Sequence, residues 1–174
     1  HDGSVANIAG GARSGGSGED GNGNVVRQES VFVESDVDNE ELFLDSRQIE
    51  WINKLYLEQD YNGIGFAKKE VERKIKSYKN QDIVKNKHDP EKLIKYDECL
   101  EKLFLSKLKC YYCKTDCIFL YNNVRDPKQW TLERKDNSIG HITDNVEICC
   151  YKCNVKRGTK NSEAFRFAKQ MKIK

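Results

Sequence analysis

The chain has 174 residues, 37% hydrophobic and 33% charged, which suits one ordinary domain with a modest core under a highly charged surface. No segment approaches the roughly 18 consecutive apolar residues of a membrane helix, so we expect no membrane partner. We also expect no small-molecule substrate. Residues 1–50 carry 11 acidic and 3 basic side chains, whereas the remainder carries 17 acidic and 27 basic ones. That basic remainder predicts a polyanion such as nucleic acid as a partner, although a solvated lysine-rich surface explains the charge equally well.

Residues 1–44 are predicted to be a disordered tail. Their first 24 positions hold eight of the twelve glycines, and residues 34–41 are strongly acidic. So few apolar side chains cannot offset the entropy lost on ordering. We interpret the acidic stretch as solubilising, with competition against nucleic acid for the basic part as the alternative.

Residues 45–108 are predicted to form a helical region. Asp45 and Ser46 are suitable N-cap residues for a first helix, which the glycine-containing turn at 60–65 ends. A second helix is predicted over 66–85, and Asp89-Pro90 is predicted to open a third, with Asp as cap and Pro at the first helical position. The apolar residues at helical spacing are Ile49, Ile52, Tyr56, Val71, Ile75, Tyr78, Leu93, Tyr96, Leu100, Leu103 and Phe104.

Residues 109–174 are predicted to form a small mixed module. β-Branched and aromatic residues predict short strands over 118–121, 130–133 and 146–149. A helix is predicted from Tyr151, and Ser162 is a candidate cap for a last helix. The fold class that follows is α+β, a helical region followed by a strand-and-helix module.

The chain contains seven cysteines, and two pairs of them have C-x-x-C spacing. A disulfide framework favours an even count in a short secreted chain, so metal binding in a reducing compartment is the better interpretation. We therefore expect an intracellular protein of the cytoplasm or nucleus, not a secreted one.

The two pairs are Cys110/Cys113 and Cys150/Cys153, with 36 residues between them. Two such turns can present four thiolates to one point and form a closed tetrahedral zinc site, which is structural because no position stays open for water. Such a site would supply folding free energy that a short module lacks. A redox dithiol and buried thiols are the alternatives. The cysteines left outside the site are Cys99, a predicted core residue, Cys117 and Cys149.

The segment between and after the two pairs resembles the HNH, or ββα-metal, endonuclease family in its zinc-bearing form. The similarity covers about residues 105–160, and it lies in Trp130-Thr-Leu-Glu-Arg-Lys-Asp-Asn137, Ser138-Ile-Gly-His141, Thr143-Asp-Asn and Cys150-Tyr-Lys-Cys-Asn154. It is most similar to a subgroup associated with bacteriophages and large DNA viruses. The resemblance implies a ββα-metal module that the four-cysteine zinc site holds together.

The resemblance also implies roles for individual residues. Glu133 stands at the family's metal-binding acid, and Asn154 at the third signature position on the helix that faces the metal. Asn145 stands at the middle asparagine, whose side chain orders the loop between strand and helix. Glu133 and Asn154 offer hard oxygen ligands suited to a catalytic Mg²⁺ or Mn²⁺.

Arg134 occupies the place of the first histidine, the general base of the family. An arginine stays protonated and cannot take that role, but it can clamp phosphate or stabilise developing charge. His141, on the loop that contains Gly140, is the only histidine nearby and is the first candidate for the base. Asp136 is the second candidate.

The resemblance implies an endonuclease that hydrolyses phosphodiester bonds, with double-stranded DNA as the expected substrate. Retention of Glu133 and Asn154 favours this activity. The arginine at position 134 favours an alternative, a zinc module that binds nucleic acid without cleaving it. A zinc-stabilised protein-interaction domain is a third interpretation, in which the basic charge is incidental.

Overall fold

The structure is a computed structural model, and it describes residues 18–19, 25–26 and 39–171. The predicted disordered tail therefore lies largely outside the described residues. Within it, β1 (Gly18–Glu19) pairs antiparallel with β2 (Val25–Val26), and α1 spans Asn39–Leu42. Among the described residues, no helix combines the length and apolar content that crossing a bilayer requires.

The predicted helical region contains η1 (Asp45–Arg47), α2 (Gln48–Tyr56), α3 (Ile64–Val84) and α4 (Tyr96–Ser106). The first two predicted helices are confirmed, although no side chain of the described residues caps η1 or α2. Gly63 joins α2 to α3 at a φ of +89°, a left-handed conformation, and a Cβ there would lie 2.9 Å from Trp51.

The third predicted helix begins six residues later than expected. Asp89 accepts hydrogen bonds from the backbone N–H groups of residues 91 and 92, but these close only a turn. The chain then forms a bridge between Leu93 and Ile142, and the N–H of Ile94 donates to the carbonyl of His141 at 2.9 Å. This pairing with a distant segment holds residues 93 and 94 in an extended conformation and delays α4 to Tyr96.

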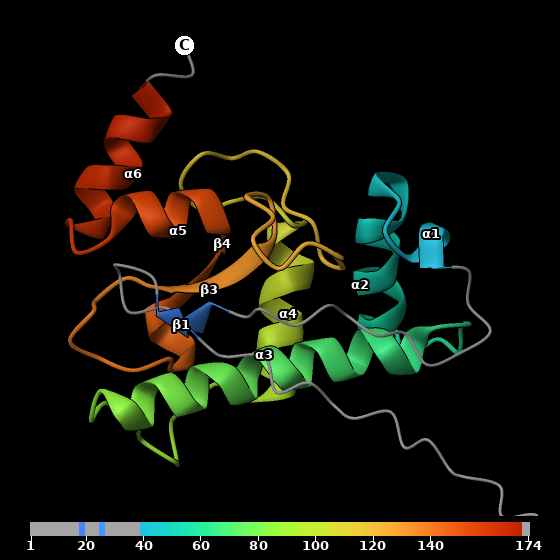
Figure 1. Ribbon diagram of the computed structural model, residues 1–174, viewed down its shortest axis with the longest axis horizontal. Helices are drawn as coiled ribbons and strands as arrows, with labels where there is room; N and C mark the ends of the chain where they lie inside the picture. The colour runs from blue at the N-terminus through green and yellow to red at the C-terminus, as the bar shows by residue number, and fades with distance from the viewer. Residues whose placement is uncertain (1–17, 20–24, 27–38, 172–174) are drawn as a thin grey trace, which may run out of the picture.

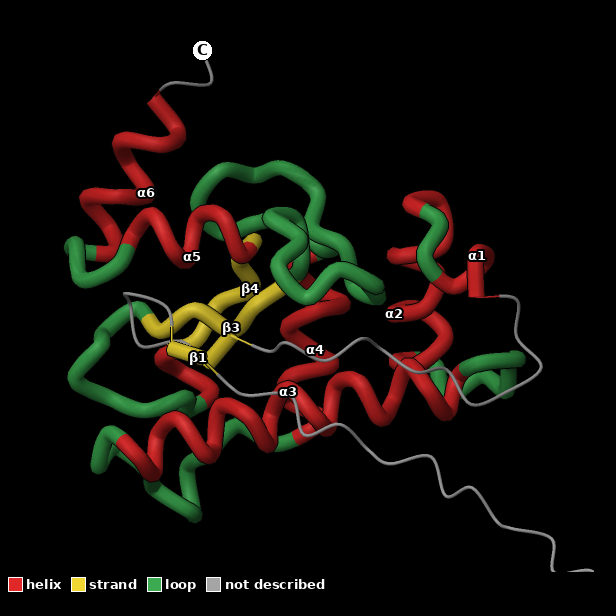
Figure 2. Tube along the Cα trace, viewed as in Figure 1, coloured by secondary structure: helices red, strands yellow, loops and turns green. Residues whose placement is uncertain are grey.

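A strand–strand–helix unit follows. β3 (Trp130–Arg134) pairs antiparallel with β4 (Val146–Cys150), with η2 (Thr143–Asn145) before β4 and α5 (Tyr151–Arg157) directly after it. Figures 1 and 2 show the two strands lying between α5 on one side and α3 and α4 on the other. The predicted strands at 130–133 and 146–149 are thereby confirmed.

The strand predicted over 118–121 is wrong. Ile118 makes a single parallel bridge with Gln129, and the next residues form no ladder. The side chain of Gln48, on α2, takes the place of a neighbouring strand. Its Oε1 accepts hydrogen bonds from the backbone N–H groups of Phe119 at 2.9 Å and Leu120 at 2.7 Å. Because these buried groups are already paired, the segment is stable without a neighbouring strand.

α3 also satisfies the free edge of β3. Lys74 Nζ donates to the carbonyl of Trp130, and the backbone N–H of Leu132 donates to Tyr78 Oη at 3.1 Å. Asp82 continues the same row and contacts the loop after β3. Lys74, Tyr78 and Asp82 are four residues apart, so they share one face of α3, which we call the α3 polar row.

The hydrophobic core is continuous from the helices into the strand-and-helix unit. Trp51 on α2, Phe119 and Trp130 are all at most 2% exposed. The last helix, α6 (Ser162–Met171), projects from this body (Figure 1). The prediction that Ser162 caps it is wrong: Asn161 Oδ1 accepts the N–H of residue 164, and the Ser162 hydroxyl lies 2.9 Å from Tyr112 Oη.

Candidate functional site

The four predicted zinc ligands converge. The Sγ atoms of Cys110, Cys113, Cys150 and Cys153 all lie within 4.8 Å of one another. The first pair lies on a turn that the Lys114 N–H closes onto the carbonyl of Cys110 at 3.0 Å, and the second pair lies where β4 passes into α5. Four cysteines so close together could hold a metal ion such as zinc.

The close approach of these thiols favours ionisation of one of them. Hydrogen bonding with Cys149, Cys150 and Cys153 lowers the pKa of Cys110 far below its ordinary value. The pKa values of Cys113 and Cys153 are raised, that of Cys113 mainly by burial and that of Cys153 mainly by hydrogen bonding with Cys110. The Cys149 Sγ is 3.8 Å from that of Cys110 but donates to the carbonyl of Cys150. As predicted, Cys99 is a core residue, 0% exposed, and burial raises the pKa of its thiol to about 12.

A small polar pocket lies next to this cluster, between the end of β3 and α5. Its wall contains four of the five residues predicted to act in catalysis. The fifth, Asn145, supports the loop that closes the pocket. The lining residues are Leu132, Glu133, Arg134, Asn137, His141, Asn154 and Gly158.

Glu133 is the buried acid of this pocket, only 4% exposed. Its Oε1 accepts a hydrogen bond from Arg157 Nη1 at 2.9 Å, whereas its Oε2 is buried and has no hydrogen-bond partner among the described residues. Burial raises the pKa of Glu133 to about 7, although Arg157 and Arg134 act in the opposite direction. The side chain is thus an acid with one oxygen in need of a proton or a cation.

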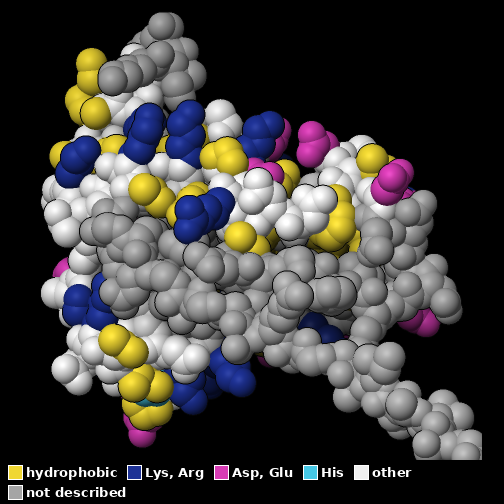
Figure 3. All heavy atoms as spheres, in the orientation of Figure 1, with side chains coloured by type: hydrophobic (Ala, Val, Ile, Leu, Met, Phe, Trp, Pro, Cys, Tyr) yellow, Lys and Arg dark blue, Asp and Glu magenta, His cyan; other side chains and the backbone are white. Residues whose placement is uncertain are grey.

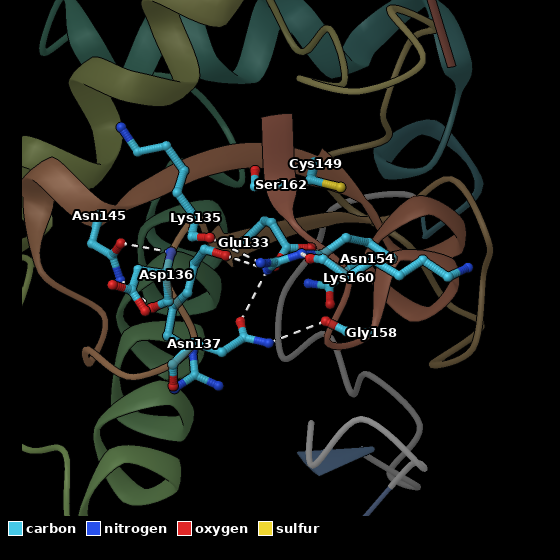
Figure 4. Close-up of polar contacts among 12 residues, drawn as sticks. Glu133, Lys135, Asp136, Asn137, Asn145, Cys149, Asn154, Gly158, Lys160 and Ser162 are labelled. Carbon is cyan, nitrogen blue, oxygen red and sulfur yellow. Dashed lines mark hydrogen bonds and ion pairs between the residues drawn. The ribbon is translucent and has the colours of Figure 1, made fainter. Parts of the chain in front are cut away.

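Arg157, on the last turn of α5, joins the walls of the pocket. Besides Glu133, its guanidinium donates to the backbone carbonyls of Arg134 at 2.6 Å and Lys135 at 2.8 Å. Nη1 also donates to Asn137 Oδ1 at 2.9 Å, and Asn137 Nδ2 donates on to the carbonyl of Gly158 (Figure 4). A single buried side chain therefore fixes the end of β3, the following loop and the end of α5.

Asn154 enters the pocket from the other side, on the first turns of α5. Its Nδ2 donates to Thr131 Oγ1 at 3.1 Å, and that hydroxyl donates to the carbonyl of Cys149 at 2.7 Å. This chain of hydrogen bonds sets the orientation of the amide, with its oxygen on the side away from Thr131. Asn154 is 6% exposed, and it follows directly after the cysteine cluster.

Asn145 holds the loop between β3 and β4. Its Oδ1 accepts the N–H of Asp136 at 3.0 Å, and its Nδ2 donates to the carbonyls of Asp136 at 2.9 Å and Gly140 at 3.1 Å (Figure 4). The side chain therefore orders this loop, because its hydrogen bonds replace backbone pairing across it.

The two candidate bases differ in position. His141 is 1% exposed and lines the pocket, with its Nδ1 2.7 Å from Asp82 Oδ1. Asp136 is outside the pocket lining, and its Oδ1 accepts hydrogen bonds from the N–H and hydroxyl of Ser138 at 2.8 and 2.6 Å. These bonds lower the pKa of Asp136, which makes it a weaker proton acceptor. The position of His141 in the pocket wall therefore favours it over Asp136.

Arg134 is buried and faces the same pocket. Among the residues that the structure describes, its Nη1 makes only long hydrogen bonds, to the carbonyls of Asn137 at 3.4 Å and Ile139 at 3.3 Å. Both bonds are near the upper limit of useful length, so the guanidinium can exchange them for a stronger acceptor such as a phosphate oxygen.

Sequence reasoning missed three residues of this site: Asp82, Asn137 and Arg157. Arg157 had a usable signal, because it follows Asn154 by three residues and the HNH family pattern has Lys or Arg at that place. Asn137 is the last residue of the segment 130–137 that carries the resemblance. Asp82 had none, because an acid on a long charged helix is normally solvated and its partner lies 59 residues away.

Comparison of the chain with protein-family models, with curated proteins and with solved structures found no match. The fold and the site together define an α+β protein in which a four-cysteine cluster able to hold a metal adjoins a buried polar pocket. What this pocket does has to be argued from its chemistry.

Proposed function

We propose that this chain is a zinc-stabilised endonuclease of the HNH type that hydrolyses phosphodiester bonds in DNA. One observation carries the proposal: a strand–loop–strand–helix unit gathers Glu133, His141 and Asn154 around one pocket beside the cysteine cluster. An acid, a neutral base and an amide oxygen are the groups that metal-assisted phosphodiester hydrolysis needs.

The residues present fit a divalent cation. Within the part of the chain that the structure describes, the Oε2 atom of Glu133 is buried without a partner, a costly arrangement that a cation would relieve. Asn154 lines the same pocket, and an amide oxygen is a ligand that a hard cation accepts. Bound at these two residues, Mg²⁺ or Mn²⁺ would supply charge stabilisation for the scissile phosphate and the leaving oxygen.

The protein's own groups supply the remaining roles. His141 accepts the proton of the attacking water. Arg134 donates hydrogen bonds to a phosphate oxygen, which fixes the substrate at the pocket. Asn145 keeps the loop of His141 closed, and Arg157 holds Glu133 in place. The arginine at position 134 thus changes the location of the base but leaves the reaction the same.

A row of lysines beside the site suits a polyanionic substrate. Lys152, Lys156 and Lys160 are exposed and are spaced four residues apart along and just beyond α5. Figure 3 shows lysine and arginine side chains gathered on this side of the molecule. Such a row attracts a phosphate backbone without regard to sequence, and the attraction weakens as salt rises.

The test is cleavage of a supercoiled plasmid by the purified full chain with Mg²⁺ or Mn²⁺. We expect Glu133→Gln and Asn154→Ala to reduce the rate by at least about 100-fold, because each removes a group that acts in the transition state. Glu147→Gln, opposite Glu133 in the sheet, and the exposed Asn122→Ala are the matched controls and should cleave normally.

Cleavage that all four variants retain would trace the activity to a contaminant or another site and would overturn the proposal. Absence of cleavage by the natural chain, with DNA binding that falls steeply with salt, would instead support a binding module without catalysis. The ion pair between Arg157 and Glu133, which satisfies one carboxylate oxygen without a metal, is the observation that favours this second function.

A further inference from the structure

We infer that Asp82, on α3, is the positioning residue for His141 and fixes the imidazole as the tautomer whose unprotonated Nε2 faces the pocket. The inference rests on the proposed function for its catalytic consequence, but its structural content is independent of any activity. It joins the helical region to the site, because Asp82 lies outside the segment that resembles a nuclease.

The geometry at Asp82 leaves one arrangement of protons. Its Oδ2 accepts the backbone N–H of His141 at 2.7 Å, and its Oδ1 lies 2.7 Å from Nδ1 of the same residue. A carboxylate has only acceptors to offer, so the Nδ1 atom must carry the proton. Neutral imidazole has one N–H, and Nε2 is then a lone-pair acceptor.

The surroundings keep that ring neutral and in place. His141 and Asp82 are 1% and 2% exposed, and the ring of Tyr78 lies against the imidazole with centroids 4.4 Å apart. Burial lowers the pKa of His141, assisted by the nearby charges of Arg134 and Lys85, although Asp82 acts in the opposite direction. Within the described part of the chain, the ring makes its only hydrogen bond at Nδ1.

The neighbouring glycine makes the contact possible. A Cβ at Gly140 would lie 2.5 Å from the carbonyl oxygen of Lys87 and 2.8 Å from Asp82 Oδ2. Any larger residue would push the loop away from α3 and lengthen both bonds between Asp82 and His141. Glycine is thus required at position 140 because there is no room for a Cβ atom, and not because of an unusual backbone angle.

The pair has the form of a carboxylate–histidine dyad that aims a base at a pocket. Free histidine favours the other tautomer, with the proton on Nε2, in which the pocket would face a donor that cannot take a proton from water. Replacement of Asp82 by Asn tests this directly. An amide has one acceptor, which the backbone N–H of His141 requires, so its NH₂ group would donate to Nδ1 and move the ring proton to Nε2.

The first measurement is the ¹⁵N NMR spectrum of the His141 side chain in the full chain, with no nucleic acid present. We expect the Nδ1–H tautomer in the natural protein and the Nε2–H tautomer in Asp82→Asn, with Asp144→Asn, an exposed acid, unchanged. The same tautomer in the natural protein and in Asp82→Asn would overturn the inference. A protonated ring in the natural protein at pH 7 would overturn it as well.

The second measurement is the plasmid cleavage rate. Loss of a well-placed general base lowers rates by about 10²–10⁴-fold, and we expect Asp82→Asn to fall in that range. In a His141→Ala background the same change should cost no more than about twofold, because Asp82 acts through the imidazole. If the rate reductions caused by Asp82→Asn and by His141→Ala multiply in the double variant, Asp82 has a role that does not depend on His141. A natural chain that does not cleave, but shows the expected tautomers, would refute the proposed function and leave the dyad standing.

Discussion

Glu133 should make the stability of this protein depend on pH, with a sign opposite to that of an ordinary surface acid. Its pKa is raised from 4.5 to about 7 by burial. Between these values the folded protein binds a proton that the unfolded chain has lost, so the free energy of unfolding falls as pH rises. Below about pH 4.5 the stability contribution is fully present, and above about pH 7 it is gone.

The perturbation is Glu133→Gln, which keeps the shape of the side chain and removes the titration. A shift of about 2.5 units at 1.36 kcal/mol each gives a total of about 3 kcal/mol, of which about 2.5 kcal/mol falls between pH 5 and pH 8. The side chain is only 5% exposed, so solvent screening takes little from this figure. Relative to the natural protein, the Gln variant should therefore become more stable by about that amount as pH rises.

The assay is urea unfolding of both proteins at pH 5, 6, 7 and 8, with no divalent cation added. The stability difference between the two proteins is the measured quantity, because any effect of pH on the cysteine cluster is common to both and cancels. Glu147→Gln, on the neighbouring strand and 33% exposed, is the control for loss of a glutamate from the sheet. A flat difference for Glu133→Gln would refute the reasoning, since it would mean that its carboxyl group titrates alike in the folded and unfolded chains.

Two further predictions concern structure. Elemental analysis should find about one zinc per chain. Cys150→Ser or a strong chelator should remove the zinc and abolish cooperative thermal unfolding of the strand-and-helix unit, because structural zinc supplies folding free energy of about 10 kcal/mol or more. Cys99→Ala should keep the zinc, and loss of zinc from this variant would contradict the ligand set. Gln48→Ala should lower the free energy of unfolding in urea by about 2–4 kcal/mol, because two buried backbone N–H groups lose their acceptor. The exposed Gln59→Ala should leave the stability unchanged. Equal stability of the two variants would contradict the prediction.

The features that local spacing determines could be predicted from the sequence. Two C-x-x-C pairs sufficed to predict the cluster, since each turn brings its own two thiols together and only one point can serve both pairs. The periodicity of apolar residues gave the positions of α2 and α3 to within a few residues. The strands at 130 and 146 followed from β-branched and aromatic composition.

The features that distant partners determine could not be predicted. The start of α4 depends on pairing of residues 93 and 94 with 141 and 142, and no local signal reports it. The segment 118–121 has strand composition, but Gln48 takes the hydrogen bonds that a strand partner would use. The pocket residues between 133 and 154 were predicted from the sequence, but Asp82 was not, since the buried role of one acid is invisible in a helix rich in charged residues.

The α3 polar row has a consequence for the limits of the smallest working unit. A peptide cut at residue 109 would keep the cysteines and the pocket residues, yet β3 would present an unpaired backbone edge that invites strand exchange with other copies. Its histidine would also turn freely, with no carboxylate to select between its two ring nitrogens. Transfer of the β3–β4 hairpin to another scaffold therefore requires that α3 be transferred with it.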